Sequence, residues 1–260
     1  MGWDPEDALD YFDRYHITWW GGEKDNRPTS LIHSSQVACI NHLYWLRSRQ
    51  DAAFAVLNAL RNDITCACIV DDGFVEFEVV GKGNVLGEHA VSRGEYATAF
   101  DALMVAQKVD GENLLVAIEW KYTEELRDED KLTDARREIY DPFLRALDCP
   151  ILTDDPTRLY RDPFYQLMRE TLLAWQLTES GAYGANEYIH VNVTPKANKG
   201  LRSPSTKLGG DDLESAWRRM LKDPDRYVVI DPQDLLTPAA QKAETKAIMW
   251  YLAERYWASE

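Results

Sequence analysis

The sequence predicts an α/β fold whose core runs in the order helix, strand hairpin, strand, strand, helix, strand, with further helices at both ends. Three observations predict it. Two strand-like apolar runs, 98–109 and 113–123, flank the turn dipeptide Asp110-Gly111. An amphipathic helix over 163–177 precedes another strand run over 187–195. Strands followed by helices in this way are typical of a sheet covered by helices.

The first part of the chain is expected to be helical. Asp4 and Pro5 have the residue types of an N-cap and a first-turn proline, and they predict a helix over 6–15. Apolar residues recur at helical spacing over 36–49, and residues 52–60 continue as helix after a break.

A strand hairpin follows these helices. Residues 64–72 and 74–81 are β-rich and are separated by Asp72-Gly73, which is a strong signal for a two-residue turn. Residues 81–95 are rich in glycine and predict an irregular loop. The remaining elements are expected as a charged helix within 129–147, a basic loop over 196–210, a helix over 213–221, a short strand over 226–231 and a closing helix over 238–256.

The chain is expected to form one domain over residues 1–260, with a core at about 31–195 and a C-terminal extension over 196–260, because 260 residues with 45% hydrophobic content can bury a sizeable core. The four cysteines form no CxxC pair and the five histidines no zinc pattern, so reduced thiols are expected. No run approaches the ~18 apolar residues of a membrane span. The acidic N-terminus is unlike a signal peptide. We therefore expect a cytoplasmic protein without membrane attachment.

The formal net charge of −15 argues against a protein that coats nucleic acid through bulk electrostatics, because phosphate contacts depend on Lys and Arg. A local basic groove, or a carboxylate site filled by a metal ion, can still reverse the field where a substrate binds.

The stretch LLVAIEWKYTEE, residues 114–125, becomes charged where its apolar character ends. Strand alternation places Glu119 and Lys121 on one face, and Asp101 lies near the far end of the preceding strand. A two-residue Asp110-Gly111 loop would pair position 101 with 120 and turn Asp101 to the other face. A three-residue loop that includes Glu112, or a bulge, would pair 101 with 121 and bring all three side chains together. We predict the second arrangement.

These residue types together point to metal chemistry. Two converging carboxylates raise each other's pKa and repel unless a cation lies between them, and hard oxygen ligands suit Mg²⁺ or Mn²⁺. An ion between Asp101 and Glu119 can acidify a bound water and polarise a phosphoryl oxygen. Lys121 can then orient the water and neutralise charge in the transition state. The alternative is a strand-end ion pair that simply emerges from the core.

The E-x-K spacing alone carries little weight, because Glu129-Asp130-Lys131 and Glu244-Thr245-Lys246 share it. The first lies in an exposed charged run. The second lies in a predicted helix, where side chains two positions apart do not face each other. Only Glu119-Trp120-Lys121 lies in an apolar strand that follows a strand with an acidic residue.

At these positions the chain resembles the PD-(D/E)xK superfamily of restriction-endonuclease-like nucleases, and within it a prokaryotic branch of uncharacterised proteins. The resemblance rests on Phe100-Asp101-Ala102, on IEWKYTE at 118–124, on PFYQLMR at 163–169 and on the element order αβββαβ, and it covers about residues 31–230. It implies a central mixed sheet flanked by helices. Phe100 stands where the superfamily's nominal proline would be, which is a common departure.

The resemblance also implies roles for individual residues. Asp101 and Glu119 would be metal ligands together with the backbone carbonyl of Trp120, and Lys121 would be the catalytic lysine. Members often add a polar residue from flanking elements, and the candidates here are Glu88, Gln36 and Gln166. The alternatives are a solvated loop carboxylate for Glu88 and helix residues that cap or bridge structure for Gln36 and Gln166.

The one basic cluster in this acidic chain is the predicted loop with Lys196, Lys199, Arg202 and Lys207. A mobile basic loop beside a hydrolytic cleft would suit a nucleic-acid phosphate clamp, although a solubilising surface loop is the alternative. The expected partners are a DNA substrate and either a second copy of the chain in a homodimer or a protein of the same defence system.

The sequence therefore favours a Mg²⁺- or Mn²⁺-dependent nuclease that hydrolyses phosphodiester bonds in DNA, in prokaryotic defence or DNA processing. A non-catalytic subunit of the same fold that binds nucleic acid or a protein partner is the alternative, because fold does not guarantee activity. An unrelated α/β enzyme is disfavoured, since the chain lacks a Gly-rich phosphate loop, GxSxG and HExxH.

Overall fold

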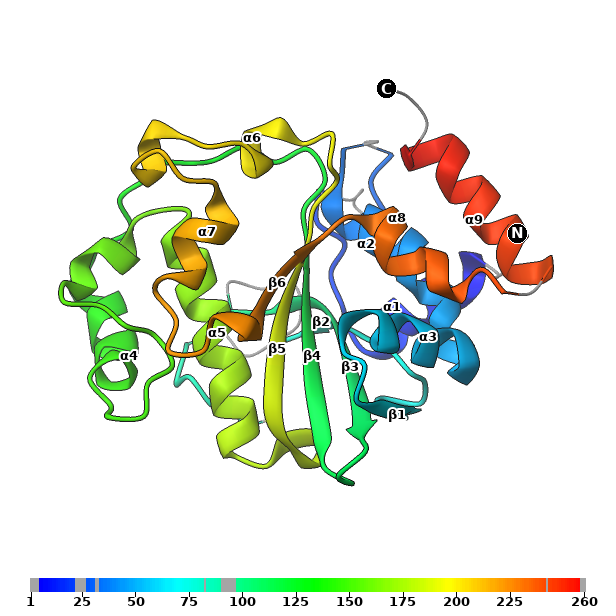
Figure 1. Ribbon diagram of the computed structural model, residues 1–260, viewed down its shortest axis with the longest axis horizontal. Helices are drawn as coiled ribbons and strands as arrows, with labels where there is room; N and C mark the ends of the chain where they lie inside the picture. The colour runs from blue at the N-terminus through cyan, green and yellow to red at the C-terminus, as the bar shows by residue number, and fades with distance from the viewer. Residues whose placement is uncertain are drawn as a thin grey trace.

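The structure is a computed structural model that describes residues 5–21, 27–30, 33–81, 83–89, 97–241 and 243–257. Figure 1 shows a central sheet with helices on both sides. Its six strands follow the order β1-β3-β4-β5-β6, and β2 also pairs with β3. The strands are β1 (Ile64–Cys68), β2 (Glu76–Val79), β3 (Phe100–Lys108), β4 (Asn113–Trp120), β5 (Ala185–Val193) and β6 (Tyr227–Ile230).

The sheet is mixed, as the sequence predicts. Strands β1, β2 and β4 pair with β3 in antiparallel fashion, whereas β4–β5 and β5–β6 are parallel. Parallel neighbours need a long crossover connection, and the segment between β4 and β5 supplies it with two helices.

Two groups of helices cover the two faces of the sheet (Figure 1). Helices α1–α3, α8 and α9 contribute to the hydrophobic core on one face of the sheet. Helix α5 contributes most of the helical residues to the core on the other face. The helices are α1 (Pro5–Arg14), α2 (Ser35–Leu43), α3 (Gln50–Leu60), α4 (Asp134–Leu144), α5 (Phe164–Glu179), α6 (Lys199–Arg202), α7 (Leu213–Arg218), α8 (Pro232–Leu236) and α9 (Ala243–Leu252). Within the described residues no helix is long and apolar enough to span a bilayer.

The predicted pairing of residues 64–72 with 74–81 as a strand hairpin is wrong, because β1 and β2 both pair with β3 and only an isolated bridge, Val70 with Gly73, forms at the turn. Some element boundaries also differ from the sequence prediction. The helix expected over 36–49 ends at Leu43 and continues as a 3-10 turn, Tyr44–Ser48. The basic loop contains the short helix α6, because the Asn198 side chain accepts the N–H of Leu201 and caps it. The predicted cap Asp4 lies outside the described residues, as do residues 82 and 90–95 of the glycine-rich loop.

The β3–β4 hairpin has the loop parity that the site needs. Lys108 N donates to the carbonyl of Glu112, so Val109, Asp110 and Gly111 form a three-residue loop. The pairs run from Gln107 with Asn113 to Ala102 with Ile118, which brings position 101 level with position 119. The predicted pairing of 101 with 121 is therefore wrong by two residues, because the loop begins one residue earlier than expected. The parity of the register is unchanged, since a shift of two residues keeps positions 101 and 119 on the same side of a regular ladder.

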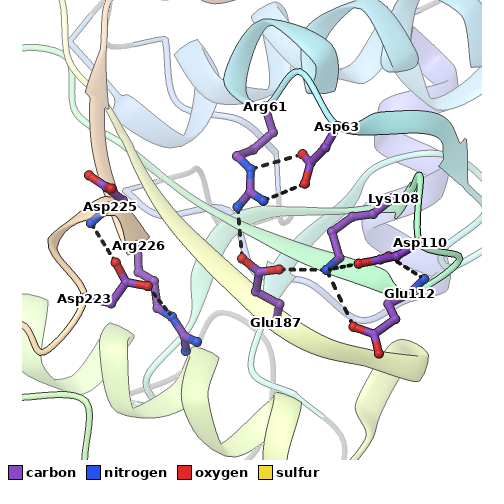
Figure 2. A network of polar contacts seen from close by, with 9 residues as sticks. All are labelled: Arg61, Asp63, Lys108, Asp110, Glu112, Glu187, Asp223, Asp225 and Arg226. Carbon is purple, nitrogen blue, oxygen red and sulfur yellow. Dashed lines mark hydrogen bonds and ion pairs between the residues drawn. The ribbon is translucent and has the colours of Figure 1, made fainter.

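An ion-pair network closes the hairpin end of the sheet (Figure 2). Lys108, whose side chain is 8% exposed, lies 3.0 Å from Glu187 and 3.1 Å from Asp110. Glu187 on β5 also accepts from Arg61 at 2.9 Å, and Arg61 pairs with Asp63 at 2.7 Å. Burial alone would raise the pKa of Glu187, but hydrogen bonds from Arg61 and Lys108 lower it below its ordinary value. The network ties β3, β5 and the α3–β1 connection together.

Replacing Glu187 with Gln should lower the free energy of unfolding at neutral pH by about 1–2 kcal/mol, because two cations lose their shared carboxylate. The depressed pKa means that this contribution is present above the unfolded pKa and is lost as pH falls through the folded pKa. Urea denaturation at neutral and acid pH should therefore show a difference that shrinks with acid. Glu112→Gln is the control, since Glu112 is 54% exposed and lies 3.6 Å from Lys108. Equal losses in both variants would contradict a special role for Glu187.

Candidate active site

The candidate site lies in a cleft of about 490 Å³ at the end of β4 away from the hairpin loop. The predicted trio, Asp101, Glu119 and Lys121, lines this cleft. Helix α5 forms another side of the cleft with Gln166 and Glu170. The ends of two interior strands and one side of α5 therefore meet at the three residues that the sequence singles out.

Asp101 occupies a break in the strand ladder. The β3–β4 pairing ends at Ala102 and Ile118, and beyond it the Asp101 carboxylate accepts the backbone N–H of Trp120 at 2.7 Å. Phe100 also leaves the regular alternation, because it packs in the core of the α5 face together with Leu103. The side chain of Asp101 thus takes the position of a backbone acceptor and is held beside the end of β4.

Glu119, Lys121 and Gln166 form a closed triangle of hydrogen bonds. Lys121 Nζ donates to Glu119 Oε1 at 2.6 Å and to Gln166 Oε1 at 3.1 Å. Gln166 Nε2 donates to the same Glu119 oxygen at 2.7 Å. The amide uses both of its ends, so it fixes the lysine and the carboxylate relative to each other.

The electrostatics of the two carboxylates favour a cation between them. Burial, followed by the charges of Asp101 and Glu170, raises the pKa of Glu119 well above its usual value. Burial also raises the pKa of Asp101 to about 6, although Lys121 and the Trp120 N–H act against it. Burial would lower the pKa of Lys121, but Glu119, Glu170 and Asp101 together raise it, so the ammonium stays charged.

The donor set fits a hard divalent cation. Glu119 is buried and Asp101 is partly buried. Two carboxylates that resist ionisation beside each other gain most from a cation that takes up both charges. No group of three Asp, Glu, His or Cys side chains in the described residues forms a metal site by itself. The ligands would therefore be Asp101 and Glu119, with the carbonyl of Trp120 completing the protein donors.

Glu170 is a charged residue of the site that the sequence analysis missed. Glu170 is 2% exposed, and its Oε2 lies 3.1 Å from Nε2 of His190 on β5, which is also buried. It shifts the pKa values of Glu119 and Lys121 through its charge. The signal was available, because Gln166 and Glu170 are four apart and share one face of α5.

Gln36 and Glu88 lie outside the cleft lining. Gln36 donates to Glu78 Oε1 at 2.7 Å and accepts from the backbone N–H of Trp20 at 2.9 Å, so it connects the N-terminal arm to β2. Glu78 itself lines the cleft. Glu88 accepts from Thr98 N at 2.7 Å and from the Tyr140 hydroxyl, in a buried network behind the site.

The structure brings Leu201 of the basic loop to the cleft, but none of the four predicted basic side chains lines it. Lys196 pairs with Asp234 at 2.7 Å, Lys207 donates to the carbonyl of Leu126 at 3.0 Å, and Arg202 donates to the carbonyl of Thr194 at 2.6 Å. Arg202 lines a smaller neighbouring cavity of about 110 Å³, and Lys199 is exposed on α6. Three of the four basic side chains of this loop therefore bind groups of the protein itself.

Replacing Asp101 with Asn should stabilise the metal-free protein by about 1–2 kcal/mol at neutral pH, because the raised pKa of Asp101 means that its ionised form is disfavoured in the folded protein. It should also abolish the rise in melting temperature that Mg²⁺ or Mn²⁺ gives the wild type. Thermal melts with EDTA and with each metal measure both effects. Asp154→Asn, at an exposed position, should behave as wild type. An equal metal response in the Asp101 and Asp154 variants would argue against a cation at Asp101.

Comparison with known proteins identifies the family of the chain. Residues 5–257 match the protein family described as restriction endonuclease associating with ARP. Searches of curated proteins and of solved structures found no match. The matched segment contains the whole cleft, and the mixed α/β sheet is that of a restriction-endonuclease-like fold. The chain therefore belongs to the family of restriction endonucleases associating with ARP.

Proposed function

We propose that the protein is a Mg²⁺- or Mn²⁺-dependent nuclease that hydrolyses phosphodiester bonds in DNA. The observation that carries the proposal is the convergence of Asp101, Glu119 and Lys121 in one cleft, with Lys121 hydrogen-bonded to Glu119. Membership of a restriction endonuclease family supports it.

Each residue of the trio has a physical task in this reaction. Asp101 and Glu119 hold the divalent ion, with the carbonyl of Trp120 as a further donor. When bound, the ion supplies Lewis-acid polarisation of the phosphoryl oxygen and lowers the pKa of a water molecule. Lys121 keeps its charge in the cleft because three carboxylates raise its pKa. Its ammonium can therefore stabilise the negative charge that develops on the phosphoryl oxygens.

Gln166 has a positioning task. Its amide contacts both Lys121 and Glu119, at 3.1 and 2.7 Å, so it restricts the lysine to one side of the carboxylate. A side chain held in this way loses less freedom when the substrate binds. The contact connects α5 to the proposed site, although most of the buried residues of this helix serve the core.

A non-catalytic subunit that binds nucleic acid or a protein partner is the second candidate, and the net charge of −15 favours it. The cleft opposes it. A module without chemistry gains nothing from Glu119 and Asp101 beside each other, since their burial raises both pKa values and costs stability.

Lys121→Met should reduce Mg²⁺- or Mn²⁺-dependent cleavage by about 100-fold or more, because the charge on the transition state loses its counterion. The assay should offer linear and nicked duplex DNA, single-stranded DNA and RNA. Lys246→Met is a matched control, since Lys246 belongs to an E-x-K of the same spacing on α9 and is exposed. The proposal fails if no nucleic acid is cut with either metal, or if both lysine variants cleave as the wild type does.

We also propose that the protein acts together with an ARP protein in a prokaryotic defence system, because the family is described as associating with ARP. Co-expression of the two proteins should give a complex that survives size-exclusion chromatography. Separate elution of the two proteins would remove the support for a physical association.

A further inference from the structure

The cleft carries a second set of charges beside the carboxylates. Its lining includes Arg127, Lys131, Arg136 and Arg169 as well as Lys121. These residues come from the segment before α4, from α4 and from α5. The protein as a whole is acidic, so the presence of several basic side chains in the same cleft as the trio points to a local role for them.

Arg169 is held in place by neighbours on two sides. Its Nε donates to the hydroxyl of Thr98 at 2.8 Å, and its Nη2 lies 3.5 Å from Oε1 of Glu88. The guanidinium stands over the ring of Tyr165, with 5.3 Å between its central carbon and the ring centroid. Glu88 thus acts on the cleft through Arg169 and Thr98, both of which line it.

Arg136 stands over the same ring from helix α4. Its central guanidinium carbon lies 5.2 Å from the centroid of the Tyr165 ring, and its Nη1 donates to the carbonyl of Lys131 at 2.7 Å. Two guanidinium groups therefore share one buried aromatic ring at the cleft wall. The contacts with the ring, with the Lys131 carbonyl and with the Thr98 hydroxyl restrict both side chains, so less freedom remains to be lost when an anion binds.

Arg136 differs from most cations of the protein in its partners. Among the described residues it forms no ion pair with a carboxylate, whereas Lys131 pairs with Asp162 at 3.5 Å and Lys196 with Asp234 at 2.7 Å. In a chain with 44 acidic and 29 basic residues, an arginine in a cleft without a carboxylate partner has unused capacity for an external anion. Arginine suits phosphate oxygens in particular, because its N–H groups form a planar fork.

We infer that Arg136 and Arg169, placed on Tyr165, bind a backbone phosphate of the nucleic acid that neighbours the scissile phosphate at the proposed metal site. This inference rests on the proposed function and specifies its substrate: a strand with several phosphodiesters, bound through its backbone. The two arginines and the trio line one cleft, so a single strand can reach both. Arginine contacts to phosphate carry no base information, so this part of the site is independent of sequence.

Binding without metal tests the inference separately from catalysis. Fluorescence anisotropy with labelled DNA and RNA of the same sequence, in EDTA and over a series of salt concentrations, gives the affinity and its salt dependence. Arg136→Gln should weaken binding about 5- to 30-fold and reduce the salt slope by about one. DNA and RNA should respond alike, since the contact is to phosphate. Arg136→Lys should recover part of the affinity, because it restores the charge but not the planar fork.

Arg137→Gln is the matched control. It removes the same charge one position along α4, but Arg137 pairs with Asp141 at 3.3 Å and does not line the cleft. It should bind as the wild type does, and circular dichroism should show both variants folded. The inference is overturned if the two variants bind equally, or if the wild type binds neither DNA nor RNA at low salt. Loss of binding in Arg136→Gln, together with no metal-dependent cleavage by the wild type, would reject the nuclease proposal and keep the phosphate site.

Discussion

The site depends on one constraint, which is that Asp101 and Glu119 are held together where the β3–β4 ladder stops, at the end away from the hairpin loop. The ladder between β3 and β4 stops at Ala102 and Ile118, and the Asp101 carboxylate accepts the next free N–H, that of Trp120. Asp101 therefore cannot turn away from Glu119 without leaving a strand N–H unpaired. Burial raises both pKa values, and the charge of Asp101 raises that of Glu119 further, so a cation is the partner that relieves the pair.

Helix α5 joins the acidic and basic parts of the cleft. Gln166 contacts Glu119 and Lys121, Glu170 adds a buried negative charge, and Arg169 lies at the basic wall over Tyr165. All four positions fall within the first two turns of one helix, where residues three and four apart share a face. The position of this helix on the sheet therefore sets the carboxylate–lysine cluster and the arginine-lined wall of the cleft together. The net charge of the whole chain says little about such a cleft, because the field inside it comes from nearby groups.

Much of the site followed from strand periodicity and loop parity. Alternation placed Glu119 and Lys121 on one face, and a three-residue loop placed Asp101 with them, although the loop and the pairing differ from those expected. Glu170 was missed because a carboxylate on an amphipathic helix is ordinarily solvated. The basic loop was chosen on composition alone. Composition cannot show that Lys196 pairs with Asp234, or that Arg202 is used by the carbonyl of Thr194.

The sequence by itself determined the α/β class, the order of the elements and the three side chains at the end of the hairpin, because periods of 2 and 3.6 and turn dipeptides are local properties. Only the tertiary structure decided which residues surround those three. Glu170, Arg136 and Arg169 reach the cleft through the packing of α4 and α5 beside the sheet. Such packing joins segments that are far apart in the chain, and no local pattern encodes the distance between them.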